Sequence, residues 1–243
     1  MPLPHQSRNH TMPENKENAG LPKGVRRQRN GCYSITPRMP LGVVSAEKLA
    51  RIQHVVEVFQ LEEIRVTAGQ RLMIPNIPKE RLQAVLETLG LMGDTCKQYV
   101  QACPGAVTCR MGMRDSQTMG LELESFLNQF DLPAKVKSGV AGCSMCCAES
   151  YVRDIGLVGR KNGWTILFGG NAGKRVRKGD ELARNVSEDE VLDILAKVLD
   201  FYRENAKAGE RTARFVERVG IESIRRVMSK AEIQEQDGEN GHV

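Results

Sequence analysis

The chain has 243 residues, of which 40% are hydrophobic and 27% are charged, a composition that excludes a wholly disordered protein. No stretch approaches the roughly 18 apolar residues of a membrane-spanning helix, and the first twenty residues lack the apolar run of a secretory signal. The formal net charge of +5 is too weak to indicate nucleic-acid binding, but it suits an anionic substrate or an acidic partner. We therefore expect a cytoplasmic protein with no nucleic-acid and no membrane partner.

The first part of the chain predicts a tail followed by a small domain. Residues 1–30 are rich in Pro, Asn and basic residues without hydrophobic periodicity, which predicts a disordered tail. Ser45 is expected to cap a helix, residues 64–67 and 71–74 to form a hairpin, and Pro78 to begin a second helix that stops at Gly90. The order helix, two strands, helix predicts a small α+β sandwich over residues 31–95.

The second part, residues 96–229, also mixes helices and strands. We expect a helix over residues 116–130, a strand over 135–140 and a hairpin over 155–168 that turns at Asn162-Gly163. A glycine-rich loop follows at residues 169–173. Ser187 and Glu190 form a capping box before a further helix. Two shorter helical stretches reach about Lys230, and residues 230–243 form a polar acidic tail.

Six of the seven cysteines lie between residues 96 and 147, and four of them form two spaced pairs. Cys103 and Cys109 are separated by five residues, and Cys143 and Cys147 by three. Four thiolates that converge suit zinc or an iron–sulfur cluster, although structural zinc favours shorter spacings than the first pair has. Buried free thiols are the remaining alternative, since cysteine packs as a small hydrophobic residue.

These cysteines stand within longer motifs that resemble one known family. The stretch from Gly142 to Leu157, with the upstream Cys103–Cys109 pair, is similar to the signature of sirohaem- and [4Fe-4S]-containing sulfite and nitrite reductases. Residues 132–137, Leu-Pro-Ala-Lys-Val-Lys, resemble the family's Leu-Pro-x-Lys-x-Lys stretch, and residues 64–71 resemble its T-x-x-Q strand. The similarity covers residues 31–229 and points to a small, single-unit member of the assimilatory sulfite reductase type.

The resemblance implies an α+β fold, in which a small ferredoxin-like sandwich precedes a mixed α+β half-domain that binds sirohaem and a [4Fe-4S] cluster. It implies that Cys103, Cys109, Cys143 and Cys147 hold the cluster and that Cys147 bridges it to the sirohaem iron. Cys146, Cys96 and Cys32 match no ligand position, and we interpret them as packed thiols.

The resemblance also implies a reaction, the six-electron reduction of sulfite to sulfide. A ferredoxin-like or flavin-containing donor would supply the electrons. The same site would suit the reduction of nitrite to ammonia. A non-catalytic electron-transfer subunit that holds only the cluster, and a thiol-rich structural or zinc protein, are alternatives from other classes.

Basic and polar residues are expected to hold the anion and the carboxylates of sirohaem. Lys135 and Lys137 match the family's Lys-x-Lys and are the first candidates for the substrate site, because residues two apart on a strand share a face. The further candidates for substrate are Arg71 and Arg110. Those for the cofactor are Arg65, Thr67, Gln70, Arg114, Gly170, Asn171, Lys174 and Arg175.

The chain departs from the larger members of this family in two ways. They contain two copies of the unit around one sirohaem, whereas this sequence has one, so a homo- or hetero-oligomer is one way to complete the pocket. Ala141 also replaces the hydroxyl-bearing or β-branched residue that usually precedes the Gly-Cys pair.

Overall fold

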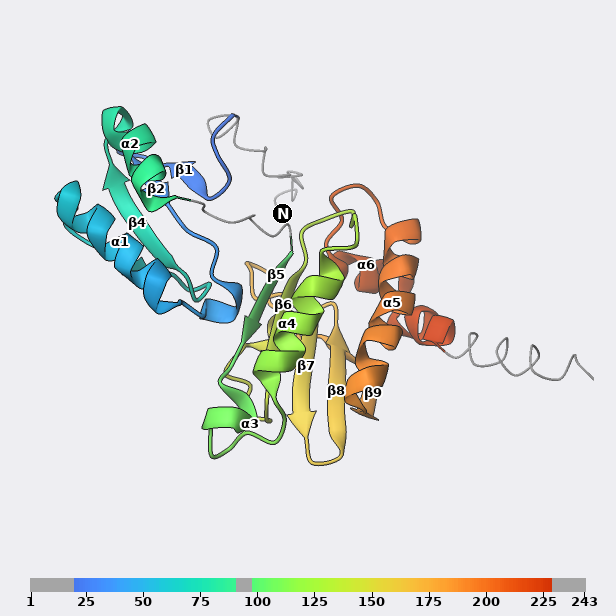
Figure 1. The fold of residues 1–243 in the computed structure, drawn as a ribbon. Coiled ribbons are helices and arrows are strands. Elements are labelled where there is room, and N and C mark those ends of the chain that lie inside the picture. The colour runs from blue at the N-terminus through green and yellow to red at the C-terminus, as the bar shows by residue number, and fades with distance from the viewer. Residues whose placement is uncertain (1–19, 91–97, 229–243) are drawn as a thin grey trace, which may run out of the picture. The chain divides into compact units, whose positions relative to one another are not determined.

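A computed structural model of the chain describes residues 20–90 and 98–228, which fall into two compact units. The first unit holds residues 20–39 and 44–90, and the second holds residues 40–43 and 98–228. Both combine helices with a β-sheet, so the α+β class expected from the sequence is confirmed (Figure 1). None of the helices in the described ranges is long and apolar enough to cross a membrane.

The first unit is an antiparallel sheet of four strands that packs against two helices. The strand order is β1-β2-β4-β3, with β1 at Val25–Arg27, β2 at Tyr33–Ile35, β3 at Arg65–Val66 and β4 at Leu72–Ile77. Helices α1 (Ala46–Val58) and α2 (Lys79–Leu89) bury apolar side chains against the sheet. The predicted start and stop signals are confirmed: the Ser45 hydroxyl accepts the Lys48 N–H, and Gly90 ends α2.

The prediction that residues 1–30 form a disordered tail is wrong from residue 25 onward, because β1 pairs with β2 there. Val25 is buried, and two polar side chains that suggested disorder make specific hydrogen bonds. The Asn76 N–H donates to Gln28 Oε1, and Asn30 Nδ2 donates to Asn76 Oδ1. Residues 1–19, and the predicted acidic tail at 230–243, lie outside the described residues.

The second unit contains a five-stranded sheet in the order β5-β6-β7-β8-β9. Strands β5 (Tyr99–Ala102), β6 (Lys137–Ala141) and β7 (Ile155–Arg160) run parallel, and β8 (Gly163–Phe168) and β9 (Asp180–Val186) complete the sheet in antiparallel fashion. The predicted hairpin is β7–β8. Neither β5 nor β9 was expected from the sequence.

Helices cover one face of this sheet (Figure 1). They are α4 (Ser116–Leu127), α5 (Glu188–Asn205) and α6 (Thr212–Val219), and residues 221–228 are also helical. Trp164 and Phe168 of β8 and Tyr202 of α5 are fully buried in the core between the layers. The capping box of Ser187 and Glu190 is confirmed at the start of α5.

The opposite face of the sheet carries glycines where another segment approaches the strands closely. A Cβ atom on Gly156 of β7 would lie 2.0 Å from the carbonyl oxygen of Ser150, and one on Gly139 of β6 would lie 2.4 Å from that of Ala148. The turn η3 (Ser150–Val152) therefore packs directly on the backbone of β6 and β7. Side chains at these positions would push the segment off the sheet.

A partly buried glutamate, Glu210, fixes the connection between α5 and α6. Glu210 Oε1 and Oε2 accept hydrogen bonds from Arg218 at 2.9 and 2.7 Å, and Oε2 also accepts the Lys207 N–H. The Tyr202 hydroxyl donates to the Glu210 carbonyl oxygen. The hydrogen bond from Arg218 is the main reason that the pKa of Glu210 falls to about 2.

This lowered pKa predicts an acid-sensitive contribution to stability. A carboxyl whose pKa is depressed in the folded state stabilises the fold above its ordinary value of 4.5, and this contribution is lost as the pH falls toward 2. Glu210→Gln should therefore lose less stability over this pH range than the unaltered chain. Urea denaturation followed by fluorescence of the single tryptophan, Trp164, measures the difference. The exposed Glu204→Gln is the control, and equal pH dependence in all three proteins would contradict the prediction.

Candidate metal centre

The parallel pairing of β5 and β6 brings the two cysteine pairs to one edge of the second sheet. Ala102 pairs with Val140 at the carboxyl ends of these strands, and the Cys103 N–H donates to the Val140 carbonyl oxygen at 3.1 Å. Cys103 follows β5 directly, and Cys143 lies two residues after β6. Because parallel strands end at the same edge of a sheet, both cysteine loops begin side by side.

Glycines allow the two cysteine loops to touch through their backbones. Gly142 accepts hydrogen bonds at its carbonyl oxygen from the Met113 and Arg114 N–H groups, at 2.8 and 3.1 Å. A Cβ atom on Gly142 would lie 2.6 Å from the Arg114 carbonyl oxygen and 2.9 Å from the Cα atom of Gly105. Gly105 has a φ of +65° and belongs to the short helix α3 (Gly105–Thr108) between Cys103 and Cys109. A larger residue at Gly142 would separate the loops.

The cysteines of this edge have different surroundings. Cys143 is buried, Cys103, Cys109 and Cys146 are partly buried, and Cys147 is exposed; all are free thiols. Cys103 Sγ accepts the Gly142 N–H at 3.1 Å and lies 3.3 Å from the Ser116 hydroxyl oxygen. Cys146 has a φ of +57° where the chain turns back toward Cys143. Cys32 belongs to the first unit, and Cys96 lies outside the described residues.

The thiols of the two cysteine loops are the donor type that iron–sulfur clusters use. Within residues 20–90 and 98–228, no three His, Cys, Asp or Glu side chains meet closely enough to chelate one metal ion. Four thiols nevertheless project from two loops that are joined by backbone hydrogen bonds, and thiolates are the preferred ligands of iron–sulfur clusters. A [4Fe-4S] cluster presents four separate iron corners, so its thiolates need not meet at one point.

The predicted substrate lysines lie at the other edge of the sheet. β6 begins at Lys137, so the prediction that Lys135 lies on this strand is wrong; both side chains are exposed and flank the buried Val136. The five residues of β6 place its first and last Cα atoms about 13 Å apart. The structure thus separates the Lys-x-Lys stretch from the cysteines of its own unit.

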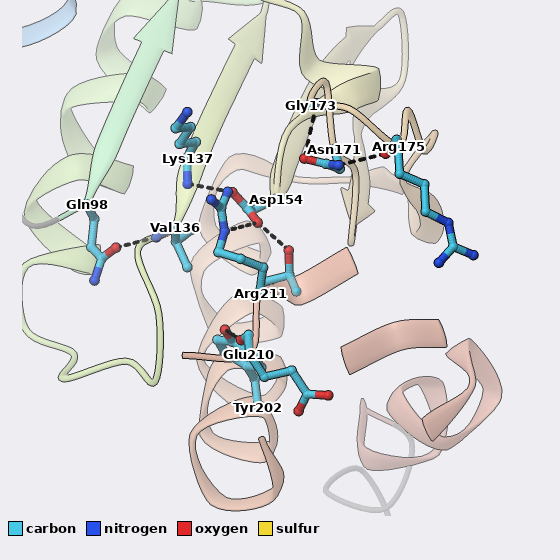
Figure 2. Close-up of polar contacts among 11 residues, drawn as sticks. Gln98, Val136, Lys137, Asp154, Asn171, Gly173, Arg175, Tyr202, Glu210 and Arg211 are labelled. Atoms are coloured by element: carbon cyan, nitrogen blue, oxygen red, sulfur yellow. Dashed lines mark hydrogen bonds and ion pairs between the residues drawn. The ribbon is translucent and has the colours of Figure 1, made fainter. Parts of the chain in front are cut away.

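A buried carboxylate that was not among the candidates organises this second edge (Figure 2). Asp154 is 1% exposed and precedes β7. Its side chain accepts the Lys137 N–H at 2.9 Å and the Thr212 hydroxyl at 2.5 Å, and it binds the Arg211 guanidinium through both oxygens. The first residue of β6, the start of β7 and the start of α6 are therefore held by one group. Asp154 was visible in the sequence as part of the family motif, but Arg211 and Thr212 had no local signal.

Arg114 is engaged with the protein itself. Its Nε and Nη2 atoms donate to the carbonyl oxygens of Arg160 and Lys161 at 3.0 and 2.8 Å, and Nη1 lies 3.2 Å from Glu188. These contacts tie the loop after Cys109 to the end of β7 and to α5. They give Arg114 a structural role, and its expected contact with the cofactor stays a prediction.

The glycine-rich loop also uses its polar groups internally. Asn171 Nδ2 donates to the Arg175 carbonyl oxygen at 2.7 Å, and Oδ1 accepts the Gly173 N–H (Figure 2). A Cβ atom on Gly170 would lie 2.4 Å from the Arg153 carbonyl oxygen, so this glycine serves close backbone packing. Arg175 contacts Glu217, and Lys174 is exposed. The loop lies beside Asp154, because the Gly169 N–H donates to the Asp154 carbonyl oxygen.

The remaining candidates divide between the two units. Thr67 and Gln70 form the tip of the β3–β4 hairpin, where the Thr67 hydroxyl bonds the Arg71 backbone and Gln70 has a φ of +55°. Arg65, on the exposed edge strand of that sheet, pairs with Glu63. Arg110 is exposed and directly follows Cys109, which makes it the candidate cation placed at the cysteine edge.

Family models match both units of the chain. The nitrite/sulfite reductase ferredoxin-like half domain matches residues 25–92, and the nitrite and sulphite reductase 4Fe-4S domain matches residues 93–236. The chain therefore belongs to the nitrite and sulfite reductase family, which confirms the resemblance seen in its cysteine motifs and the ferredoxin-like character of the first unit.

Individual relatives and solved structures agree with this assignment. The chain is 42% identical to an assimilatory-type sulfite reductase of Nitratidesulfovibrio vulgaris over 85% of its own length and 97% of that protein. It is 37% identical to a nitrite reductase [NAD(P)H] of Bacillus subtilis, of which it covers only 26%. The structure of the Mycobacterium tuberculosis NirA protein matches 83% of this chain and 41% of NirA, with a TM-score of 0.68 at 26% identity.

The Asp154 contacts predict a large loss of stability when its charge is removed. Asp154→Asn should lower the free energy of unfolding by about 2 kcal/mol or more, because hydrogen bonds to a buried charged group are among the strongest in proteins. Urea denaturation followed by Trp164 fluorescence tests this. Asp193→Asn, on the exposed side of α5, is the matched control and should change stability by less than about 0.5 kcal/mol. Equal stability of the two variants would contradict the assigned role.

Proposed function

We propose that this protein is a small sirohaem- and [4Fe-4S]-dependent reductase that converts sulfite to sulfide. The observation that carries the proposal is the pair of cysteine loops joined at one sheet edge through Gly142, in a chain of the family's 4Fe-4S domain. The preference for sulfite is supported by coverage: the chain spans nearly all of the assimilatory-type sulfite reductase but only about a quarter of the Bacillus subtilis nitrite reductase.

Cys103, Cys109, Cys143 and Cys147 would hold the cluster, and the exposed Cys147 would also reach the sirohaem iron. When bound, the two coupled cofactors supply the redox chemistry of the reduction. The buried Cys143 anchors the second loop in the protein, whereas Cys147, four residues further along, lies at the surface where a second group can reach its sulfur. The partly buried Cys146 sits in a left-handed turn between them and is assigned no ligand role.

Side chains around the cysteines would shape the rest of the centre. Val107, Met111, Met113 and Met145 are all more than half exposed, and all lie in the two cysteine loops. They would offer an apolar surface to the macrocycle or to an electron donor of the ferredoxin-like or flavin type. Arg110 would attract the oxyanion and donate hydrogen bonds to it, because its guanidinium is always charged. Lys135 and Lys137 lie at the opposite end of β6 from the cysteines, and their role in holding the substrate stays a prediction.

Turnover with both oxyanions under one reductant tests the proposal. The full-length protein, purified without oxygen, should reduce sulfite with a higher kcat/KM than nitrite. Arg110→Gln should raise the KM for sulfite about tenfold, since it removes a charge-assisted hydrogen bond. Arg203→Gln, an exposed substitution on α5, is the control. Faster turnover of nitrite would overturn the substrate assignment. An unchanged KM for sulfite in Arg110→Gln would show that Arg110 does not belong to the substrate site. A cofactor-loaded protein that reduces neither anion would favour an electron-transfer subunit.

A further inference from the structure

A pocket of about 380 Å³ lies over β7, β8 and β9, and no cysteine lines it. Along β8, Trp164, Ile166 and Phe168 point into the core beneath the helices. Thr165 and Leu167, which alternate with them, line the pocket. The pocket therefore occupies the face of the sheet opposite the helices.

Two cations of this pocket have no acidic partner. Among the described residues, neither Arg160 nor Lys178 forms an ion pair with a carboxylate. Arg160 Nη2 instead donates to the Tyr151 hydroxyl oxygen at 3.0 Å, and Lys178 Nζ lies 5.2 Å from the centre of the Tyr151 ring. The three side chains thus form a connected group at the wall of the pocket. Because the Tyr151 oxygen accepts the hydrogen bond from Arg160, its hydroxyl hydrogen is still available to donate to another group.

The two carboxylates in the lining are each neutralised by another arginine. Asp180 pairs with Arg177 at 2.5 Å, and Glu181 pairs with Arg184 through both oxygens at 2.9 and 2.6 Å. The hydrogen bond from Arg184 is the main cause that lowers the pKa of Glu181, so this carboxylate stays ionised and paired. Arg160 also attracts Glu181 electrostatically, but within the described residues neither Arg160 nor Lys178 forms an ion pair, so the lining keeps an excess of positive charge that favours an anion.

Thr165 supplies the observation that points to a ligand. This residue is 1% exposed, and its hydroxyl has no hydrogen-bond partner within the described part of the protein. A buried hydroxyl without a partner is costly, and natural proteins rarely leave one in place without a reason. Thr165 lines the pocket but its hydroxyl oxygen is covered, so a rotation of the side chain would let it donate to an acceptor atom of a ligand there.

We propose that this pocket binds a small tetrahedral oxyanion of the phosphate or sulfate class. Arg160 and Lys178 would supply the positive charge, and the hydroxyl groups of Tyr151 and Thr165 would donate to two further oxygens. All four groups can donate hydrogen bonds, and the unprotonated oxygens of such an anion accept them. The site is separate from the cysteine centre, so it stands or falls independently of the proposed reductase activity.

Calorimetric titration of the full-length protein with inorganic phosphate, and separately with sulfate, tests the site. Both anions should bind saturably, whereas chloride at equal ionic strength should not. Arg160→Gln should weaken binding at least about tenfold, as expected for loss of a charge-assisted contact. Lys161→Gln, which removes the neighbouring exposed charge outside the pocket, should leave the affinity unchanged. Absence of saturable binding, or equal weakening in both variants, would overturn the proposal.

A second variant separates ligand binding from folding. Thr165→Val keeps the shape of the side chain and removes a hydroxyl that has no partner in the protein. Without anion its melting temperature should equal or exceed that of the unaltered chain, while its affinity for phosphate and sulfate should fall several-fold. A lower melting temperature would show that the hydroxyl serves the fold, and an unchanged affinity would show that it does not face the ligand. Either result would contradict the proposal.

Discussion

The cysteine centre depends on the parallel pairing of β5 with β6. Cys103 and Cys143 are far apart in the sequence, and only the register of these two strands makes their loops leave the same edge together. A shift of one residue in this register would turn the side chains of a strand to the other face of the sheet. The buried Val100 and Val140 support this register from the helical side, and the register brings the two halves of the cluster motif together.

Close backbone packing then sets the shape of the centre. Gly105 and Gly142 approach each other without side chains, so that Met113 and Arg114 can donate to one carbonyl oxygen. The two loops therefore pack against each other without side chains between them at Gly105 and Gly142. This arrangement leaves Cys147 and several apolar side chains exposed, whereas Cys143 is buried, and this suits the proposed contact with a second cofactor and an electron donor.

The sequence predicted those parts of the fold that carry local signals. Ser45, Gly90 and the Ser187–Glu190 capping box act within a few residues of the helix ends that they mark, and all three were read correctly. The strands β1, β2, β5 and β9 were not predicted because they are short or strongly charged, and pairing with other strands is what orders them.

The candidate site shows the same division. The spacing of the cysteines was informative because ligand chemistry restricts it. The sequence was less informative about the basic residues, because the partners of an arginine lie far from it in the chain. Arg114, for example, also contacts Lys161 and Glu188, which lie far from it in the sequence. Asn171 forms a hydrogen bond within its own loop, and the cofactor roles of both residues stay predictions.

Iron and acid-labile sulfide in two adjacent cysteine variants test the central claim most directly, together with the coupling between cluster and sirohaem seen by spectroscopy. Cys146→Ser should retain about four sulfides per chain and a coupled haem spectrum, because the proposed ligand set does not include its thiol. Cys147→Ser should lose that coupling, because the proposal has its sulfur join the two cofactors. If Cys146→Ser abolishes the cluster while Cys147→Ser spares it, the assignment of the ligands is wrong.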